Sequence, residues 1–379
     1  MIEERLRFVI AASRQEKSIA ALCREFEISR QTGHTWLKRY REGGSSQVAD
    51  RSRRPAHSPN RTDAEMEAAV VALRNRLPDW GAPKLLVLLK QQDPPCTLAV
   101  RTVHRILVRH QLLNPQDQHR SAVQRFERAA PNELWQMDFK GPQGFNQGCP
   151  VGPLSILDDH SRYLLALQHL GSTRAQGVRE TLQTTFEQVG LPDALLVDHG
   201  IPWWNHASPC GITELTIWIL QQGVRLLYSG FRHPQTQGKV ERMHGALQRA
   251  IRRRKADPTD QLWLDQFRHE YNHVRPHAGL AMSTPAKRWK ASARPFQTTP
   301  QEWEYPAGTE VRRLAGEGQL NWRGRRWEIS CALRRQLVGI EILEQRAIVY
   351  FCNAPVRELN LQSHTAQSIP IDLLRSLQC

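Results

Sequence analysis

Three acids, each placed at the end or start of a regular element, constrain this chain more than any other feature. Residues 194–197 (ALLV) form a continuous apolar run, typical of a strand buried on both faces, and Asp198 follows directly. Residues 239–255 repeat apolar side chains at helical spacing, with Glu241 in their first turn. Asp138 stands near the end of a further strand-like run, LWQMDF. The fold therefore has to accommodate three carboxylates from separate elements.

Residues 131–290 alternate strand and helix patterns around these acids. Three successive strands are predicted by LWQMDF, LSIL and RYLLALQHL, a fourth by ALLVD and a fifth by VRLLYS. Apolar stripes predict helices over residues 178–189 and 239–255, and the run TELTIWILQQG predicts another. The expected fold is an α/β core, a mixed five-stranded sheet with helices on its faces.

Residues 1–42 predict a helix, a tight turn and a second helix. The apolar spacing of residues 19–26 is interrupted before Ser29, whose side chain can cap the helix that follows. In a helix-turn-helix the second helix enters the major groove, where Arg and Gln read base edges. An ordinary helical hairpin with a solvated basic face is the alternative. The candidate DNA-contacting residues on this second helix are Arg30, Gln31, His34, Lys38 and Arg39.

The remaining segments flank the core. Residues 43–61, rich in Gly, Ser, Pro and Arg, predict a basic linker. Residues 62–130 predict a second helix-turn-helix or helical domain with Arg101 and Arg105 facing outward, or else a helical spacer. Residues 291–379 contain five short alternating runs split by Gly and Asn, which predict a small β-barrel, either DNA-contacting or a simple folded cap.

The charge balance points to a polyanionic partner. The chain has 52 Lys and Arg against 37 Asp and Glu, a formal charge of +15, and a pI near 10.0. Such an excess is expected of a phosphate-binding protein, although a merely basic protein would share it. Seven scattered cysteines without a CxxC pair argue against a disulfide framework or a zinc knuckle and favour a reducing, cytoplasmic compartment. No apolar run approaches the ~20 residues of a membrane span.

Five blocks in residues 131–290 resemble the integrase-type transposases of bacterial insertion sequences, which are relatives of retroviral integrases. The blocks are LWQMDF, ILDDHSRY, LPDALLVDHG, HPQTQGKVERMHGAL and YNHVRPHAGLAMSTPAKRW, in the family's order. The resemblance implies a ribonuclease-H-like core with a DDE triad at Asp138, Asp198 and Glu241. It also implies that the tandem helical units bind element ends and that the tail is SH3-like.

Two departures from the family pattern follow the second acid. His199-Gly200 stands where the family usually has Asn-Gly, and residues 199–240 separate the second and third acids by more than is usual. We place the extra residues in the loop WWNHASPCGITE, which can lengthen without moving either acid. Asp158 and Asp159 compete for the first triad position, but their place in a predicted hairpin turn indicates turn formation.

The chemistry of three carboxylates agrees with this resemblance. Phosphoryl transfer needs its attacking and leaving oxygens held in line, which two divalent ions about 3.5–4 Å apart achieve. Carboxylate oxygens suit Mg²⁺ or Mn²⁺ better than zinc. Clustered acids repel one another unless a cation is present. We therefore expect two Mg²⁺ (or Mn²⁺) ions, ligated by Asp138, Asp198 and Glu241, and a core that the metal stabilises.

A basic surface is predicted next to the acids. Residues 229–238 are marked by Gly and Pro and are expected to position DNA or to form a lid. His233 and His244 are expected to make hydrogen bonds or lie at the surface, with proton transfer as the alternative. The side chains expected to hold phosphates on the long helix are Lys239, Arg242, Arg249, Arg252 and Arg253.

The predicted function is that of a DNA transposase. It would bind the terminal inverted repeats of an insertion sequence, hydrolyse a strand at each end and join the freed 3′-hydroxyls to target DNA. Because two ends are joined, a homo-oligomer, a dimer or larger, is expected on double-stranded DNA in the bacterial cytoplasm, associated with the nucleoid. The alternatives are a metal-dependent nuclease that cuts without joining, and a DNA-binding regulator whose core is inactive.

Overall fold

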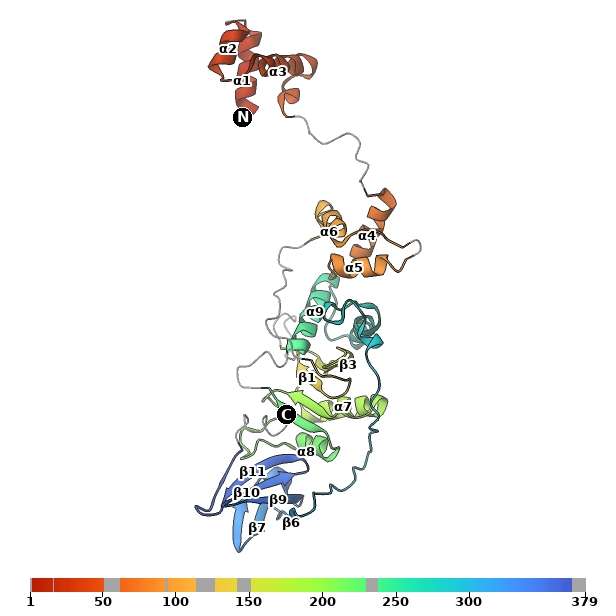
Figure 1. Cartoon of the computed structure of the whole chain (residues 1–379), viewed down its shortest axis with the longest axis vertical. Coiled ribbons are helices and arrows are strands. Elements are labelled where there is room, and N and C mark those ends of the chain that lie inside the picture. Colours follow the sequence, from red (N-terminus) through yellow and green to blue (C-terminus); the bar gives the residue numbers. More distant parts are fainter. Residues whose placement is uncertain are drawn as a thin grey trace. The chain divides into compact units, whose positions relative to one another are not determined.

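The computed structural model describes residues 2–15, 17–50, 62–92, 95–113, 127–141, 151–229 and 238–369. These fall into two compact units, Met1–Asp63 and Ala64–Cys379 (Figure 1). The predictions for the later part of the linker (51–61), for most of the loop at 229–238 and for His233 lie outside the described residues.

The first unit is a small helical domain. Its elements are α1 (Ile2–Ser13), α2 (Ile19–Glu25), α3 (Arg30–Gly43) and a 3-10 turn, η1 (Ser45–Val48). The Ser29 side chain accepts from the Thr32 amide and caps α3, as the sequence predicts. Phe8 of α1 is fully buried, and a Cβ added at Gly33 would lie 2.7 Å from Cys23 Sγ. Glycine is thus what lets the helices approach; the packing role of α1 was not predicted.

The second unit begins with three helices around their own apolar core. These are α4 (Ala64–Arg76), α5 (Ala82–Leu89) and α6 (Val100–Arg109). Trp80, in the connection between α4 and α5, is fully buried in one cluster with Val70, Leu85 and Leu107. The prediction of a helical region here is confirmed.

The central sheet has the predicted mixed topology. Its described strands are β1 (Trp135–Phe139), β2 (Leu154–Asp158), β3 (Leu164–Gln168), β4 (Ala194–Val197) and β5 (Arg225–Tyr228). They lie in the order β3-β2-β1-β4-β5. The first three strands pair antiparallel, whereas β4 pairs parallel to both β1 and β5. Consecutive hairpin strands followed by helix-connected strands require this pattern.

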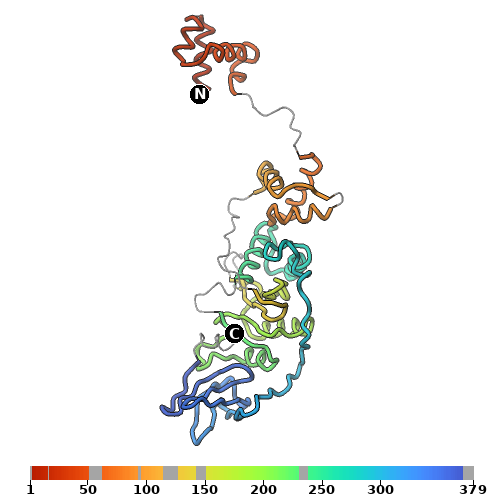
Figure 2. Tube along the Cα trace, viewed as in Figure 1, coloured from red at the N-terminus to blue at the C-terminus, as the bar shows by residue number. Residues whose placement is uncertain are grey.

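Helices cover both faces of this sheet. They are α7 (Ala175–Val189), α8 (Glu214–Gln221), α9 (Gly238–Arg254) and α10 (Gln261–His269). Phe186 of α7 and Trp218 of α8 share an apolar cluster with Trp135, whereas Met243 of α9 and Phe267 of α10 share another with Leu164. The tube view traces the chain through these elements by residue number (Figure 2). None of the helices in the described part of the chain combines the length and hydropathy of a membrane span.

The C-terminal region is a sheet with an adjoining hairpin. Its strands are β6 (Glu310–Arg313), β7 (Gln319–Trp322), β8 (Arg325–Glu328), β9 (Leu337–Leu343), β10 (Arg346–Phe351), β11 (Ala354–Asn360) and β12 (Thr365–Gln367). One sheet runs β12-β11-β10-β9-β6, and β7 pairs with β8 alone. Within residues 238–369 no pairing joins β6 to β12, so the predicted closed barrel is not observed. The sequence also failed to predict β11 and β12.

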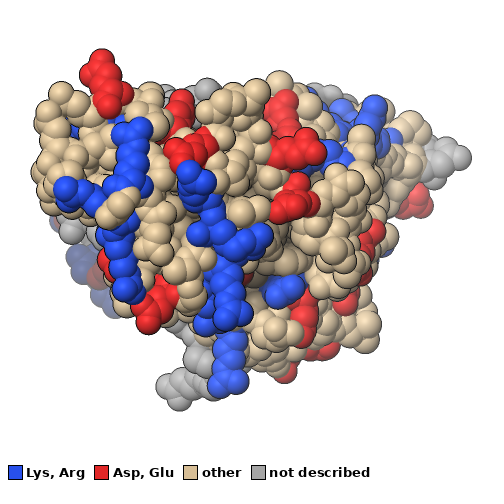
Figure 3. Space-filling model, turned by 90° about the horizontal axis from the view of Figure 1, so that it is seen from below, with Lys and Arg blue, Asp and Glu red and all other residues tan. Residues whose placement is uncertain are grey.

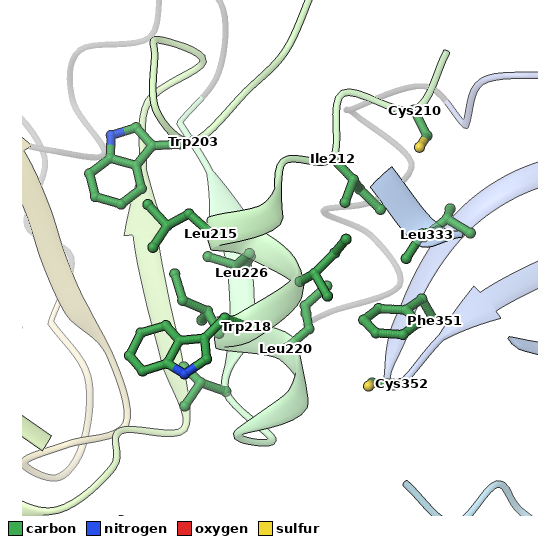
Figure 4. Packing of buried hydrophobic residues seen from close by; sticks show 14 of the residues in the cluster. Trp203, Cys210, Ile212, Leu215, Trp218, Leu220, Leu226, Leu333, Phe351 and Cys352 are labelled. Carbon is green, nitrogen blue, oxygen red and sulfur yellow. The ribbon is translucent and has the colours of Figure 1, made fainter. Parts of the chain in front are cut away.

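The C-terminal sheet shares one apolar cluster with the helices α7 and α8, which cover one face of the central sheet. Leu220 of α8 lies in the same buried cluster as Leu333 and Phe351, and Figure 4 shows these side chains beside one another. Side-chain burial of this kind stabilises the contact between the two regions. The predicted boundary at residue 290 therefore separates two chain segments that pack as one body.

Candidate active site

Asp138 and Asp198 lie at the ends of neighbouring strands. In the parallel pair of β1 and β4, Gln136 is opposite Leu196. Each acid comes two residues after one of these partners, Asp138 after Gln136 and Asp198 after Leu196. The carboxyl ends of parallel strands meet at one edge of a sheet. The two predicted acids are thus brought to the same edge.

Glu241 reaches this edge from α9. The Val240 amide, next to Glu241, donates to Gln136 Oε1 at 3.2 Å, which ties the first turn of α9 to β1. One turn further along α9, His244 Nδ1 lies 3.7 Å from Asp138 Oδ2. The third acid therefore stands on a helix whose first turns lie against the strand of the first acid.

The electrostatics of Asp138 reflect the neighbouring acids. Burial raises the pKa of Asp138 to about 7, and the negative charges of Asp198 and Glu241 contribute to this rise. Burial also raises the pKa of Glu241. Asp138 thus lies within electrostatic reach of both other acids, and ionising all three in this region is unfavourable.

Such a group of carboxylates fits a hard divalent cation. Within the described residues, no set of three His, Cys, Asp or Glu side chains is already gathered closely enough to hold a metal ion. The charges of Asp198 and Glu241 oppose the ionisation of Asp138, but the three acids do not form a closed set of ligands. A Mg²⁺ or Mn²⁺ ion would relieve that repulsion, and carboxylate oxygens are the ligands it prefers.

The loop after Asp198 makes contacts both with the second acid and with the C-terminal sheet. The Gly200 amide donates to Asp198 Oδ1 at 3.0 Å, which orients the carboxylate. The His199 ring packs 5.4 Å from Trp204 and 5.2 Å from Tyr228, between ring centroids. Further along, Arg357 of β11 donates to the Pro209 carbonyl at 3.1 Å. Trp204 thus joins an aromatic cluster with His199 and Tyr228, and Pro209 contacts the C-terminal sheet.

His244 is a buried hydrogen-bonding residue. Its Nε2 lies 2.9 Å from Ser155 Oγ on β2. Burial, with a contribution from Lys140, lowers the pKa of His244 to about 3, so the ring is neutral. This agrees with the predicted hydrogen-bonding role.

The adjacent acids Asp158 and Asp159 have different surroundings. Asp158 accepts from the Ser161 amide at 2.7 Å and the Asn132 amide at 2.8 Å, which confirms its turn-forming role. Asp159 is also fully buried, but it forms an ion pair with Lys239 at the start of α9. Lys239, predicted to hold phosphate, therefore has a buried carboxylate as its partner, a contact that sequence patterns did not reveal.

The predicted DNA-contacting residues of the helical regions stand on the expected elements. On α3 the side chains of Arg30, Gln31, His34 and Lys38 are exposed, and Arg39 is partly buried. On α6, Arg101 and Arg105 are exposed, opposite the buried Val103 and Ile106. Both helices thus present basic side chains to solvent.

The basic residues of α9 divide into two groups. Arg242 and Arg252 are exposed, and Arg249 and Arg253 are partly buried. Arg254 instead donates to Asp79 and Glu270, both at 2.7 Å. Arg254 therefore ties the end of α9 to Asp79, which lies between α4 and α5. From its basic character alone, Arg254 would be assigned to the DNA-facing surface.

Exposed arginines also gather on the C-terminal sheet and its hairpin. A space-filling view from below shows Lys and Arg side chains in continuous bands on this face (Figure 3). Two of these arginines have acidic partners, Arg312 with Glu310 and Arg326 with Glu317. Arg313, Arg323 and Arg325 in the same region are also exposed.

Known protein families match both halves of this arrangement. A helix-turn-helix domain matches residues 4–56, and a homeodomain-like domain matches residues 32–107. Two models of the integrase core domain match residues 128–234 and 222–285, which span the strands and helix of the three acids. The chain therefore has DNA-binding helix-turn-helix domains followed by an integrase core domain.

Solved structures of retroviral integrases show a weaker likeness. The simian T-cell lymphotropic virus intasome, in complex with the PP2A regulatory subunit B56 gamma, is 15% identical, with a TM-score of 0.38 over 79% of this chain and 96% of that chain. The HTLV-2 integrase catalytic core domain in complex with magnesium is 13% identical, with a TM-score of 0.33 over 42% of this chain and 97% of that chain.

Proposed function

We propose that the protein is a DNA transposase that binds the terminal inverted repeats of an insertion sequence, cleaves the element ends and joins them to target DNA. The observation that supports this most strongly is geometric: Asp138 and Asp198 follow the neighbouring parallel strands β1 and β4, and Glu241 stands on the turn of α9 that is tied to β1, in a region matched by the integrase core domain. Helix-turn-helix domains in the same chain supply the means of holding DNA.

In this proposal Asp138, Asp198 and Glu241 hold two Mg²⁺ or Mn²⁺ ions. When bound there, such ions would polarise the phosphate and clamp the attacking and leaving oxygens. The residues would first orient a water molecule for attack on the phosphorus at each element end. A P–O bond to the water oxygen would form, the P–O3′ bond of the DNA would break, and a 3′-hydroxyl would be released. That hydroxyl then attacks a target phosphodiester, whose own 3′-oxygen leaves. Each bond broken is replaced by one formed, and no covalent enzyme intermediate is needed.

The basic side chains have a separate role in binding. Arg30, Gln31 and their neighbours on α3 would read the repeat, while Arg101 and Arg105 on α6 would hold its backbone. Arg242 and Arg252 on α9 would hold phosphates near the acids. Because two element ends are joined to one target, the active form would be a dimer or larger assembly on DNA.

A joining assay tests this proposal. A labelled duplex carrying one element end is incubated with supercoiled plasmid, full-length protein and Mg²⁺. We expect labelled, joined plasmid. Release of the flanking strand without joining would instead support a nuclease, and binding with neither product would support a DNA-binding regulator.

A further inference from the structure

One buried carboxylate near the acids has no part in the proposed chemistry. Asp159 follows β2 and is fully buried. It accepts from Gln136 Nε2 at 2.7 Å and from the Arg128 amide at 2.9 Å, and it forms the ion pair with Lys239 described above. A buried carboxylate that accepts hydrogen bonds from several donors fixes both the orientation of those donor groups and their distance from it.

The partners of Asp159 belong to the two elements of the first and third acids. Gln136 precedes Asp138 by two residues on β1, so their side chains leave the same face of the strand. Lys239 precedes Glu241 by two residues in the first turn of α9. One side chain, that of Asp159, thus contacts both elements.

Gln136 closes the connection through its own amide group. It donates to Asp159 from Nε2 and accepts from the Val240 amide at Oε1, at 3.2 Å. Val240 lies in the first turn of α9, where backbone amides have no partner within the helix. Gln136 on β1 therefore accepts a hydrogen bond from a backbone amide at the start of α9. The orientation of the Gln136 side chain is in turn fixed by its hydrogen bond to Asp159.

We propose that Asp159, acting through Gln136 and Lys239, is a positioning residue that sets Glu241 against Asp138 so that the two can share a cation. The inference rests on the proposed metal-dependent function. Ionised carboxylates that approach one another without a cation repel, so Glu241 would move away from Asp138 unless α9 is held. The buried network opposes this movement at the turn that bears Glu241.

Stability alone does not account for the network. The adjoining part of α9 is already held by apolar side chains, among them Val240, Met243 and Leu247. Replacing a buried ion pair by apolar residues of similar volume is often neutral or stabilising. Hydrogen bonds are directional, so they specify the distance between α9 and β1 and the rotation of α9 about its axis, which apolar contacts do not. A metal site shared by the two elements requires both to be fixed.

The experiment titrates Mn²⁺ into the full-length protein and measures binding by calorimetry. Asp159→Asn and Gln136→Leu each remove part of the network without adding negative charge. We expect both to raise the Mn²⁺ dissociation constant by at least about 10-fold, the range for residues that orient metal ligands. Asp158→Asn is the matched control: Asp158 is equally buried beside Asp159 but contacts Ser161 and Asn132, so Mn²⁺ affinity should stay unchanged even if the midpoint of unfolding falls.

A second readout separates positioning from folding. In end joining, the half-saturating Mg²⁺ concentration should rise for both variants while their affinity for the element end stays that of the wild type. Folded Asp159→Asn and Gln136→Leu proteins with wild-type Mn²⁺ affinity would overturn the inference. If the wild type binds Mn²⁺ through Glu241 but joins no ends, the proposed function fails and the titration still decides the role of Asp159. A wild type that binds no Mn²⁺ would overturn both.

Discussion

Arg254 near the end of α9 donates a 2.7 Å hydrogen bond to Asp79, which precedes it by 175 residues. The Asp79 side chain is fully buried and also accepts from Arg275 at 2.8 Å. Burial alone would raise the pKa of Asp79. The guanidiniums of Arg275 and Arg254 outweigh this effect, so the pKa of Asp79 is lowered. This buried carboxylate ties the helical region of α4–α6 to the integrase core, so DNA bound there, as proposed, would have a fixed relation to α9.

Substitution of Asp79 should loosen that attachment. Asp79→Ala leaves Arg254 and Arg275 without their shared acid, and breaking a buried pair on one side costs about 3–5 kcal/mol. We expect a decrease of this size in the free energy of unfolding, measured by urea denaturation. Asp265→Ala removes an exposed partner of Arg268 at 3.6 Å and should change stability by less than about 0.5 kcal/mol. Equal effects of the two substitutions would contradict the account.

Divalent cations should stabilise the protein through the acid triad. Binding to the folded state alone adds about 2.7 kcal/mol at a concentration 100 times the dissociation constant. Asp138→Asn should abolish the Mn²⁺-dependent rise in the unfolding midpoint. Because it removes one of three repelling charges, it should leave the protein without Mn²⁺ at least as stable as the wild type. Glu214→Gln, at an exposed carboxylate on α8, should behave as the wild type. A variant at Asp138 that Mn²⁺ still stabilises fully would exclude this acid as a ligand.

Acidification should destabilise the protein through His277. Burial, together with the charges of Lys84 and Arg275, lowers the pKa of His277 to about 3. Between that value and the ordinary pKa of about 6.5 the unfolded chain binds a proton that the folded protein does not. Stability is therefore present above pH about 6.5 and declines towards pH 3, by up to about 1.4 kcal/mol per pH unit from this group.

His277→Gln tests this pH dependence. The variant should show a flatter decline in the free energy of unfolding over the same pH range, although the buried His244 contributes a decline of the same sign. His104→Gln, at an exposed position on α6, is the control. An unchanged slope in the His277 variant would refute the assignment.

Helix α3 should supply sequence discrimination in DNA binding. Arg30→Ala or Gln31→Ala should weaken binding to the element end by about 1–3 kcal/mol for each base pair that the side chain reads, with little effect on unrelated duplexes. Fluorescence anisotropy with both duplexes at several salt concentrations measures this. Arg7→Ala removes an exposed arginine of α1 that pairs with Glu3, and it should not alter discrimination. An equal decrease in affinity for both duplexes would make α3 a phosphate-binding helix only.

Much of the core could be predicted because its signals are local. The apolar run before Asp198 predicted the strand β4, and the stripe of Val240, Met243 and Leu247 predicted α9, because side-chain period follows directly from backbone geometry. The order of strands and helices then restricted the sheet topology. The positions of the three candidate acids followed from these elements together with the family resemblance.

The polar contacts that hold the acids in place could not be predicted this way. Asp159 and Lys239 are 80 residues apart, and no periodicity links a turn after β2 to the first turn of α9. Arg254 resembles any other basic residue of a basic helix until its contact with Asp79 is known. The strands β11 and β12 follow the hairpin of β9 and β10. Whether they form depends on pairing with the preceding strand more than on the intrinsic propensity of their residues.

The most direct test of the central claim compares the wild type with Asp198→Asn in end joining with Mg²⁺. The substitution keeps the size of the side chain and removes its charge. We expect cleavage and joining both to disappear. Affinity for the element end, measured by anisotropy, should stay within about threefold of the wild type, since about 0.5 kcal/mol is the usual limit for a change away from a contact. An Asp198→Asn protein that still cleaves and joins the ends would show that the three acids are not the active site.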